Sequence, residues 1–150
     1  MKKFLFLPLF FLLFGCSLKS PQSSKGYHVT LVSPMIKISD FGFMHEYKND
    51  ISLQIYNLAL IVAEIKISNN ICINRGCFSK SDFNAKFFKQ PYYDEILSDI
   101  LLKKPLFNGV NLEKTECGFS QNYKEISYEV CKNDLKFKDK NVKIILKEQK

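Results

Sequence analysis

Cysteine is the residue type in this sequence with the clearest capacity for chemistry. Besides Cys16, the chain carries Cys72, Cys77, Cys117 and Cys131. An even number of cysteines in an oxidising compartment predicts two disulfides, with three possible pairings. Sequence proximity favours Cys72–Cys77 and Cys117–Cys131. Zinc ligation and a redox-active pair are the alternatives, and both are disfavoured because no CxxC motif and no nearby histidine accompany these cysteines.

Cys16 follows a segment of a different kind. Lys2 and Lys3 precede an uninterrupted apolar run over residues 4–14, which contains Pro8. A membrane-spanning helix needs roughly 20 apolar residues, so this run is too short to cross a bilayer as a stable helix. A positive start followed by a short apolar run is typical of a secretory signal peptide.

The residues Leu13-Phe14-Gly15-Cys16 resemble the lipobox of bacterial lipoprotein precursors. The resemblance implies a diacylglyceryl group on the Cys16 sulfur, cleavage just before it and acylation of the new amine. Residues 1–15 would then be the signal peptide, and two or more acyl chains would hold the protein stably at a membrane. An ordinary signal peptide with an incidental Cys16 is the alternative.

The residues after Cys16 bear on where the protein lies. Residues 16–26 are mostly small and polar, which predicts a flexible tether between lipid and domain. Ser17 occupies the position at which many Gram-negative inner-membrane lipoproteins carry aspartate. The resemblance therefore implies a lipid-anchored protein of the bacterial outer membrane, facing the periplasm.

The length of the chain predicts one small domain over residues 27–150. Loss of Lys2 and Lys3 would lower the net charge from +7 to +5. A basic protein of this kind could bind nucleic acid or an anionic surface. We expect no nucleic-acid partner, because the lysines are scattered, Arg75 is the single arginine and the protein is predicted to be exported.

Apolar patterning predicts mostly β-strands. Residues 51–56 alternate apolar and polar side chains, which is typical of a half-buried strand. Other strand-like segments are residues 27–38 (interrupted by Pro34), 58–68, 71–73, 117–131 (two strands around Gln121-Asn122), 135–137 and 142–146. Residues 58–68 read as one long strand, with a bend at Asn57.

Two helices are expected midway along the chain. Residues 79–82 offer helix N-caps before Phe83, Phe87 and Phe88, and Pro91 ends this helix. Residues 92–103 carry an apolar stripe of helical spacing, with acids early and lysines late. We therefore predict an α+β fold: a mostly antiparallel curved sheet or half-barrel with about two inserted helices.

Catalytic and metal-binding patterns are missing from the sequence. Asp40-Phe41-Gly42 matches a kinase triplet, but no other kinase motif accompanies it. His28 lies in the predicted strand over residues 27–38 and His45 in the separate aromatic-rich segment over residues 40–47, without metal-ligand spacing. We expect no catalytic residue, metal or cofactor, and we predict that the protein is not an enzyme.

Two segments resemble LolB, the outer-membrane receptor for lipoproteins. They are Ile51-Ser52-Leu53-Gln54-Ile55, followed by residues 58–65, and residues 95–106, where a leucine-rich helix ends at Pro105. The resemblance implies an unclosed antiparallel barrel covered by helices around an apolar cavity. The 14 Phe and 7 Tyr residues could line such a cavity or fill a solid core.

These observations lead to two functional hypotheses. The first is an outer-membrane lipoprotein that binds acyl chains or other lipoproteins and assists their placement. The second is an envelope lipoprotein that acts as a protein-interaction or assembly module without a ligand cavity. An apolar cavity would favour the first, and a filled core with an exposed apolar patch would favour the second.

Overall fold

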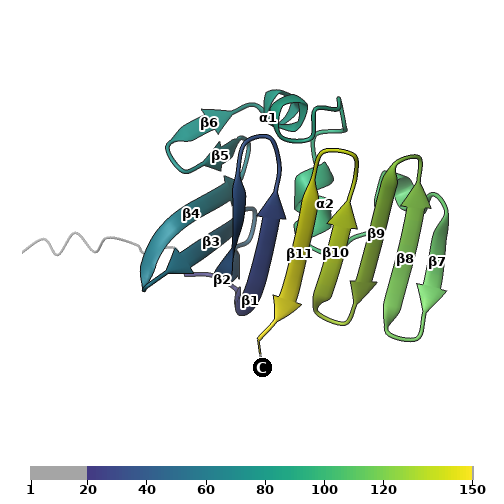
Figure 1. Ribbon diagram of the computed structural model, residues 1–150, viewed down its shortest axis with the longest axis horizontal. Helices are drawn as coiled ribbons and strands as arrows, with labels where there is room; N and C mark the ends of the chain where they lie inside the picture. Colours follow the sequence, from purple (N-terminus) through teal and green to yellow (C-terminus); the bar gives the residue numbers. More distant parts are fainter. Residues whose placement is uncertain (1–19, 150) are drawn as a thin grey trace, which may run out of the picture.

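A computed structural model describes residues 20–149, which form one large sheet with two short helices (Figure 1). The strands are β1 (Ser23–Val32), β2 (Lys37–Glu46), β3 (Ile51–Asn57), β4 (Leu60–Ile67), β5 (Ile71–Ile73), β6 (Gly76–Phe78), β7 (Leu112–Thr115), β8 (Gly118–Tyr123), β9 (Ile126–Cys131), β10 (Asp134–Lys138) and β11 (Lys143–Glu148). The helices are α1 (Lys80–Phe87), α2 (Ile96–Leu101) and the single 3-10 turn η1 (Phe107–Gly109). Because β1 begins at Ser23, residues 23–26 of the segment predicted as a tether pair with β2.

All eleven strands belong to one antiparallel sheet, in the order β6-β5-β4-β3-β2-β1-β11-β10-β9-β8-β7. The chain therefore forms two meanders, β1 to β6 and β7 to β11, with the helical segment between them. The last strand returns to the first, so that Tyr27 pairs with Glu148 and Val32 pairs with Lys143. β6 and β7 are left as the two edges of the sheet.

One face of the sheet carries the core. Alternate residues of each strand point toward it, as in β9, where Ile126, Tyr128 and Val130 are buried and the residues between them are exposed. In Figure 1, α2 lies behind the sheet and α1 lies at its upper end, next to β5 and β6. Both helices contribute fully buried side chains to the same core, including Phe87 and Ile100. The described core is therefore packed with helix side chains.

The helix α1 begins and ends where local chemistry requires it. The Ser79 hydroxyl accepts a hydrogen bond from the Asp82 amide at 3.2 Å, which satisfies one of the free N–H groups of the first turn. Buried Asn84 donates from Nδ2 to the Tyr93 carbonyl at 2.9 Å and so joins α1 to the segment before α2. Pro91 follows soon after the last turn and cannot continue a helix.

The segment between α2 and β7 is held by one buried amide. Gln121 of β8 accepts a hydrogen bond from the Leu106 amide at 2.9 Å and donates to the carbonyls of Leu106 and Val110 at 2.6 and 2.7 Å. Gln121 is 1% exposed, so these bonds replace water for three backbone groups. One side chain thereby closes the end of the core beside α2.

The prediction of an α+β fold is wrong. The protein is β-rich: a single antiparallel sheet dominates it, and the helices span only 8 and 6 residues. The second helix was expected over residues 92–103, but it covers only Ile96–Leu101. It starts late because the backbone before it forms tighter turns: the Tyr92 amide donates to the Gln90 carbonyl at 2.9 Å and the Ile96 amide to the Tyr93 carbonyl at 3.1 Å.

Candidate functional site

The turn between β3 and β4 has an unusual composition for its backbone. Leu58 and Ala59 have φ values of +47° and +65°. Tight hairpin turns with two positive φ values favour Asn-Gly, because a side chain beyond Cβ is strained in this region. A non-glycine residue there costs roughly 1–2 kcal/mol. Leu58 is nevertheless 92% exposed, so its side chain gains no packing within the described residues in return.

The strand after this turn exposes further apolar side chains. Leu60, Ile61 and Val62 are consecutive and all exposed, at 71%, 51% and 45%. Strict strand alternation would bury every second one, but the register shifts here: Tyr56 pairs with Ile61 and Ile55 pairs with Ala63, which leaves Val62 as a bulge residue. We call Leu58, Leu60, Ile61 and Val62 the apolar end of the hairpin.

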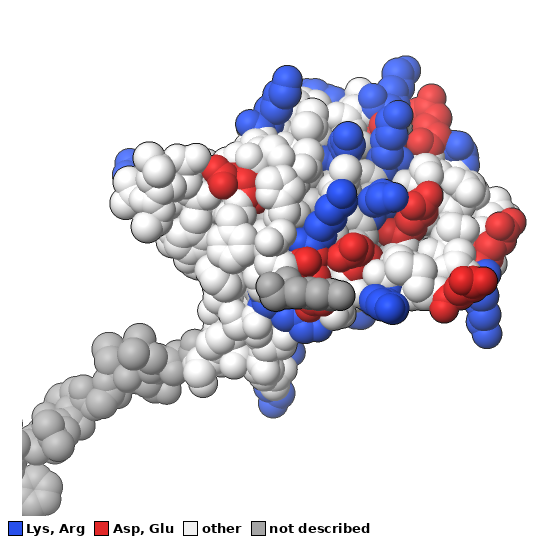
Figure 2. All heavy atoms as spheres, turned by 60° about the horizontal axis from the view of Figure 1, so that its bottom comes forward, with Lys and Arg blue, Asp and Glu red and all other residues white. Residues whose placement is uncertain are grey.

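Aromatic side chains continue this apolar surface onto the face of the sheet opposite the core. Phe41 and Phe43 of β2 are each 36% exposed, and their ring centroids lie 4.9 Å apart. The Tyr56 ring lies 5.8 Å from that of Phe43. Among the coloured elements of Figure 1, the β3–β4 hairpin end projects furthest left, and the left projection of the described surface in Figure 2 is mostly white, that is, uncharged.

The carboxylate of Asp40 stands beside this patch. Its Oδ2 accepts a hydrogen bond from Asn57 Nδ2 at 2.6 Å, and its Oδ1 accepts one from the Phe41 amide at 2.8 Å. The bond from Asn57, followed by that from Phe41, lowers the pKa of Asp40. A charge thus marks the border between the apolar end and the rest of β2.

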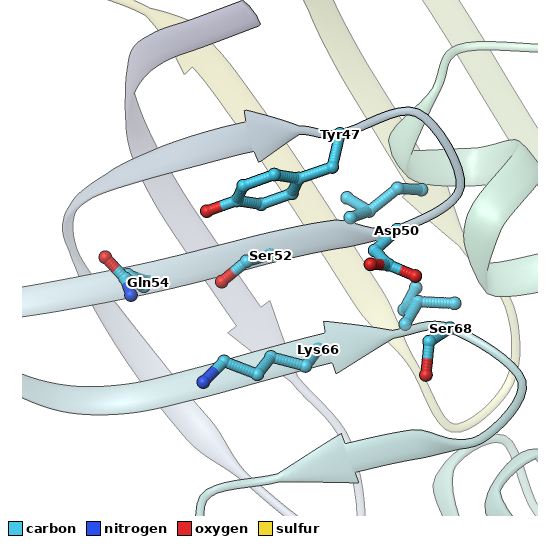
Figure 3. A pocket seen from close by; sticks show the side chains of 8 residues that line it. Tyr47, Asp50, Ser52, Gln54, Lys66 and Ser68 are labelled. Carbon is cyan, nitrogen blue, oxygen red and sulfur yellow. The ribbon is translucent and has the colours of Figure 1, made fainter. Parts of the chain in front are cut away.

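A polar groove of about 340 Å³ lies further along the same hairpin, near the β2–β3 and β4–β5 turns (Figure 3). Three of its lining residues bind the neighbouring Glu64, which accepts hydrogen bonds from Gln54 at 2.7 Å and Ser52 at 3.3 Å and pairs with Lys66 at 3.1 Å. Burial opposes ionisation of Glu64, but these partners together lower its pKa. Glu64 is therefore a satisfied carboxylate within the sheet.

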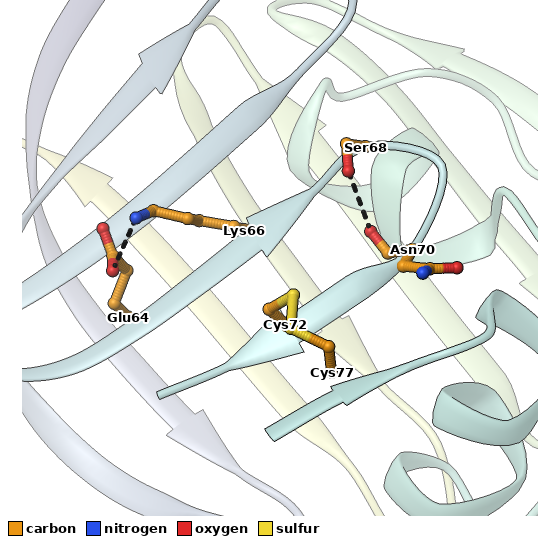
Figure 4. The surroundings of a disulfide bond; sticks show 6 residues. All are labelled: Glu64, Lys66, Ser68, Asn70, Cys72 and Cys77. Atoms are coloured by element: carbon orange, nitrogen blue, oxygen red, sulfur yellow. Dashed lines mark hydrogen bonds and ion pairs between the residues drawn. A yellow bond between two sulfur atoms is a disulfide. The ribbon is translucent and has the colours of Figure 1, made fainter. Parts of the chain in front are cut away.

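The structure pairs the four predicted disulfide cysteines as sequence proximity favours. Cys72 of β5 bonds to Cys77 of β6, directly across the hairpin and beside β4, which carries Glu64 and Lys66 (Figure 4). Cys117, in the turn before β8, bonds to Cys131 at the end of β9. The two bonds therefore lie near opposite edges of the sheet.

The histidines make separate contacts. His45 Nδ1 lies 2.8 Å from the Ser24 hydroxyl, and His28 Nε2 lies 3.4 Å from the Ser39 hydroxyl. Among residues 20–149, no group of three or more histidine, cysteine or acidic side chains is arranged to hold a metal ion. None of the helices in this part of the chain is long and apolar enough to cross a membrane.

The predicted lipid-attachment residue Cys16, the signal peptide and the first part of the tether lie outside the described residues. No protein-family model matches the chain, and no curated protein matches its sequence. The resemblances to lipoprotein precursors and to LolB therefore remain predictions from the residues quoted above.

Sequence reasoning did not find the apolar end of the hairpin. Residues 58–68 were read as one strand because Leu58 and Ala59 are not turn-forming residues. The available signal was Asn57, which marks the bend one position before the turn. A second feature, the aromatic residues around Phe107, was also missed, since their clustering depends on contacts between β8, η1 and the segment before α2.

Proposed function

We propose that this protein is a lipoprotein of the bacterial outer membrane, anchored through Cys16 and facing the periplasm. In this proposal the apolar end of the β3–β4 hairpin enters the acyl-chain region of a membrane or contacts the acyl chains of another lipoprotein. The protein would thereby assist the placement of lipids or lipoproteins, as its resemblance to LolB implies.

One observation carries the proposal: Leu58 is strained and almost fully exposed at the same time. Both properties cost free energy in the isolated protein, and a polar Asn-Gly turn would avoid both. Contact of the apolar end with acyl chains would recover about 1.5–3 kcal/mol for each large side chain removed from water. The exposed apolar side chains form a contiguous surface that includes Leu60, Ile61 and Val62. A contiguous apolar surface indicates a binding role, whereas singly scattered apolar side chains do not.

The packed core bears on how acyl chains would be bound. Phe83, Phe87 and Leu101 are at most 1% exposed, and they occupy the face of the sheet that a LolB-like cavity would use. We therefore propose that acyl chains meet the hairpin end and the adjoining Phe41–Phe43 surface. Binding would need no opening of the helices.

A second candidate function is a protein-interaction module of the envelope. The same two observations, a filled core and an exposed apolar patch, favour it. In that case the apolar end would be covered by the side chains of a protein partner. The two candidates differ in what touches Leu58.

Site-specific photo-crosslinking from position 58 in intact cells tests the proposal. We expect adducts of phospholipid or of acylated peptide, identified by mass spectrometry. A photo-crosslinker at Val110, which is 42% exposed elsewhere on the molecule, is the matched control and should give far fewer lipid adducts. A single protein adduct without acyl groups would replace the first candidate with the second.

The anchor is tested separately. Replacement of Cys16 by alanine should abolish incorporation of labelled palmitate and release the protein from membranes. Palmitate labelling that persists in this variant would contradict the lipobox assignment. Palmitate labelling does not depend on the hairpin. A wrong assignment of the anchor can therefore be distinguished from a wrong assignment of the hairpin end.

A further inference from the structure

A second candidate site lies beside Phe107, in the segment between α2 and β7. A cleft of about 440 Å³ opens there, lined by Tyr93, Asp99, Pro105, Phe107 and Asn108. Asp99 is the one charged residue among these five. The cleft belongs to the helical side of the molecule and does not include the apolar end of the hairpin.

Phe107 is held in a strained backbone conformation. Its φ is +47° and that of Asn108 is +56°, whereas a bulky residue rarely adopts positive φ. Its ring is fixed between those of Tyr93 and Tyr123, with centroids 5.2 and 5.1 Å away. Strain of this kind persists where surrounding contacts impose it, and it is concentrated at ligand-binding sites.

The Phe107 ring forms a wall shared by two clefts. The second is a cleft of about 390 Å³, whose aromatic lining is Tyr92, Tyr93, Phe107 and Tyr123. Tyr93 and Phe107 thus line both clefts, whereas Tyr92 and Tyr123 line only the second. Apolar walls with a few placed polar groups are the usual composition of a small-molecule site.

The electrostatics of the first cleft favour positive charge. Asp99 Oδ2 accepts a hydrogen bond from the Tyr93 hydroxyl at 3.0 Å. Burial, then this bond and the Asp99 charge, raise the pKa of Tyr93, which stays an uncharged donor.

Two lysines of the chain already approach these groups. Lys104 Nζ lies 4.0 Å from Asp99 Oδ1, and Lys124 Nζ lies 5.2 Å from the centre of the Tyr123 ring. The Lys104 side chain is 59% exposed, so it is free to move away when another cation arrives. A cation of the chain is thus already paired with Asp99 of the first cleft, whereas Lys124 stands over a ring of the second cleft.

We propose that the cleft lined by Tyr93, Asp99 and Phe107 binds an organic ammonium ion, such as a choline or ethanolamine group. Aromatic rings attract such cations, and a single carboxylate supplies the counter-charge. An anion would be repelled by Asp99, and a neutral acyl chain would leave that carboxylate without a partner from the ligand. The inference goes beyond the function proposed for the hairpin and does not rest on it.

Titration of the full chain with choline tests the proposal. Binding is monitored by calorimetry and by tyrosine fluorescence, which no tryptophan emission obscures because the chain has no tryptophan. We expect saturable binding of choline and none of its uncharged isostere, in which carbon replaces nitrogen. Asp99→Asn and Phe107→Gly should each weaken binding about ten-fold. Lys104→Gln should strengthen it about three-fold, because a competing internal cation is removed.

The variants include controls for charge and for folding. Glu116→Gln makes the same charge change as Asp99→Asn, but Glu116 lies in the exposed turn between β7 and β8 and lines neither cleft. It should leave binding unchanged. In Phe107→Gly, glycine adopts the φ of position 107 without strain. Asp99→Asn keeps an acceptor for the Tyr93 hydroxyl, so this variant is informative even if Phe107→Gly unfolds.

Equal binding of choline and its isostere, or no saturable binding of either, would overturn the proposal, as would an unchanged affinity in Asp99→Asn. Vesicles distinguish the source of the cation. Choline- or ethanolamine-headgroup vesicles that bind more tightly than glycerol-headgroup vesicles in an Asp99-dependent manner would assign a lipid headgroup. Binding of free choline alone would support the same site with a soluble amine as ligand.

Discussion

Restoring the usual turn residues at the end of the β3–β4 hairpin should change stability and membrane binding in opposite directions. The double replacement Leu58→Asn and Ala59→Gly gives the dipeptide that turns with two positive φ values favour. Since each non-glycine residue in that region costs roughly 1–2 kcal/mol, the free energy of unfolding should rise by about 2 kcal/mol. For a domain of this size that corresponds to an increase in Tm of about 6 °C.

The same replacement removes the most exposed apolar side chain. Leu58 is 92% exposed, so its loss does not open a cavity in the described core. If it enters the acyl region of a membrane, its absence should cost about 2 kcal/mol of binding free energy, or about a 30-fold lower affinity for vesicles.

Thermal unfolding by circular dichroism and co-sedimentation with zwitterionic vesicles measure the two effects. The matched control is Lys132→Gly in the β9–β10 turn, where φ is +54°. It should raise stability by about 1 kcal/mol and leave vesicle binding unchanged. A double variant that is less stable than the native chain would refute the strain argument, and unchanged vesicle binding would refute the role given to Leu58.

Three further predictions concern the fold. Gln121→Met should lower the free energy of unfolding by about 3 kcal/mol, because two buried backbone groups of Leu106 and the part-buried Val110 carbonyl lose their partner; a urea midpoint within error of the native value would contradict this. Removal of the Cys117–Cys131 bond by serine should cost about 3 kcal/mol and removal of Cys72–Cys77 about 2 kcal/mol, since the first closes a longer loop; the reverse order in thermal unfolding would exclude the loop-entropy explanation. Burial, then nearby Glu148, raises the pKa of Tyr27 from 10.0 to about 12, so its contribution to stability should be intact below pH 10 and lost as the pH rises toward 12; Tyr27→Phe should flatten that decline in pH-dependent unfolding.

Local patterns predict those parts of the fold that local chemistry determines. The alternation over residues 51–55 corresponds to β3, and Ser79 caps α1 as its sequence context indicates. The cysteine pairing follows from sequence proximity, because both bonds join neighbouring strands or their ends. In these cases the partner residues are close in the chain.

The remaining features depend on contacts that single segments do not encode. Leu58 and Ala59 form a turn only because β3 and β4 pair on either side of them, so their types give no turn signal. β7 has the sequence Leu-Glu-Lys-Thr and lacks apolar alternation, and it is a strand because β8 offers it an edge. Phe107 adopts positive φ because rings distant in the sequence hold it there.

The placement of the two disulfides has a consequence for how the protein resists strand exchange with other chains. An open sheet ends in strands with unpaired backbone groups, which can recruit foreign strands or peel away. Cys77 ties the edge strand β6 to β5, and Cys117 ties the β7–β8 hairpin to the end of β9. While the bonds are intact, β6 cannot separate from β5 and the β7–β8 hairpin cannot leave β9, whereas no disulfide joins β5 to β4. An oxidising compartment would thus protect the β7 edge of the sheet against exchange of a whole hairpin, and the β6 edge against exchange of the single strand β6.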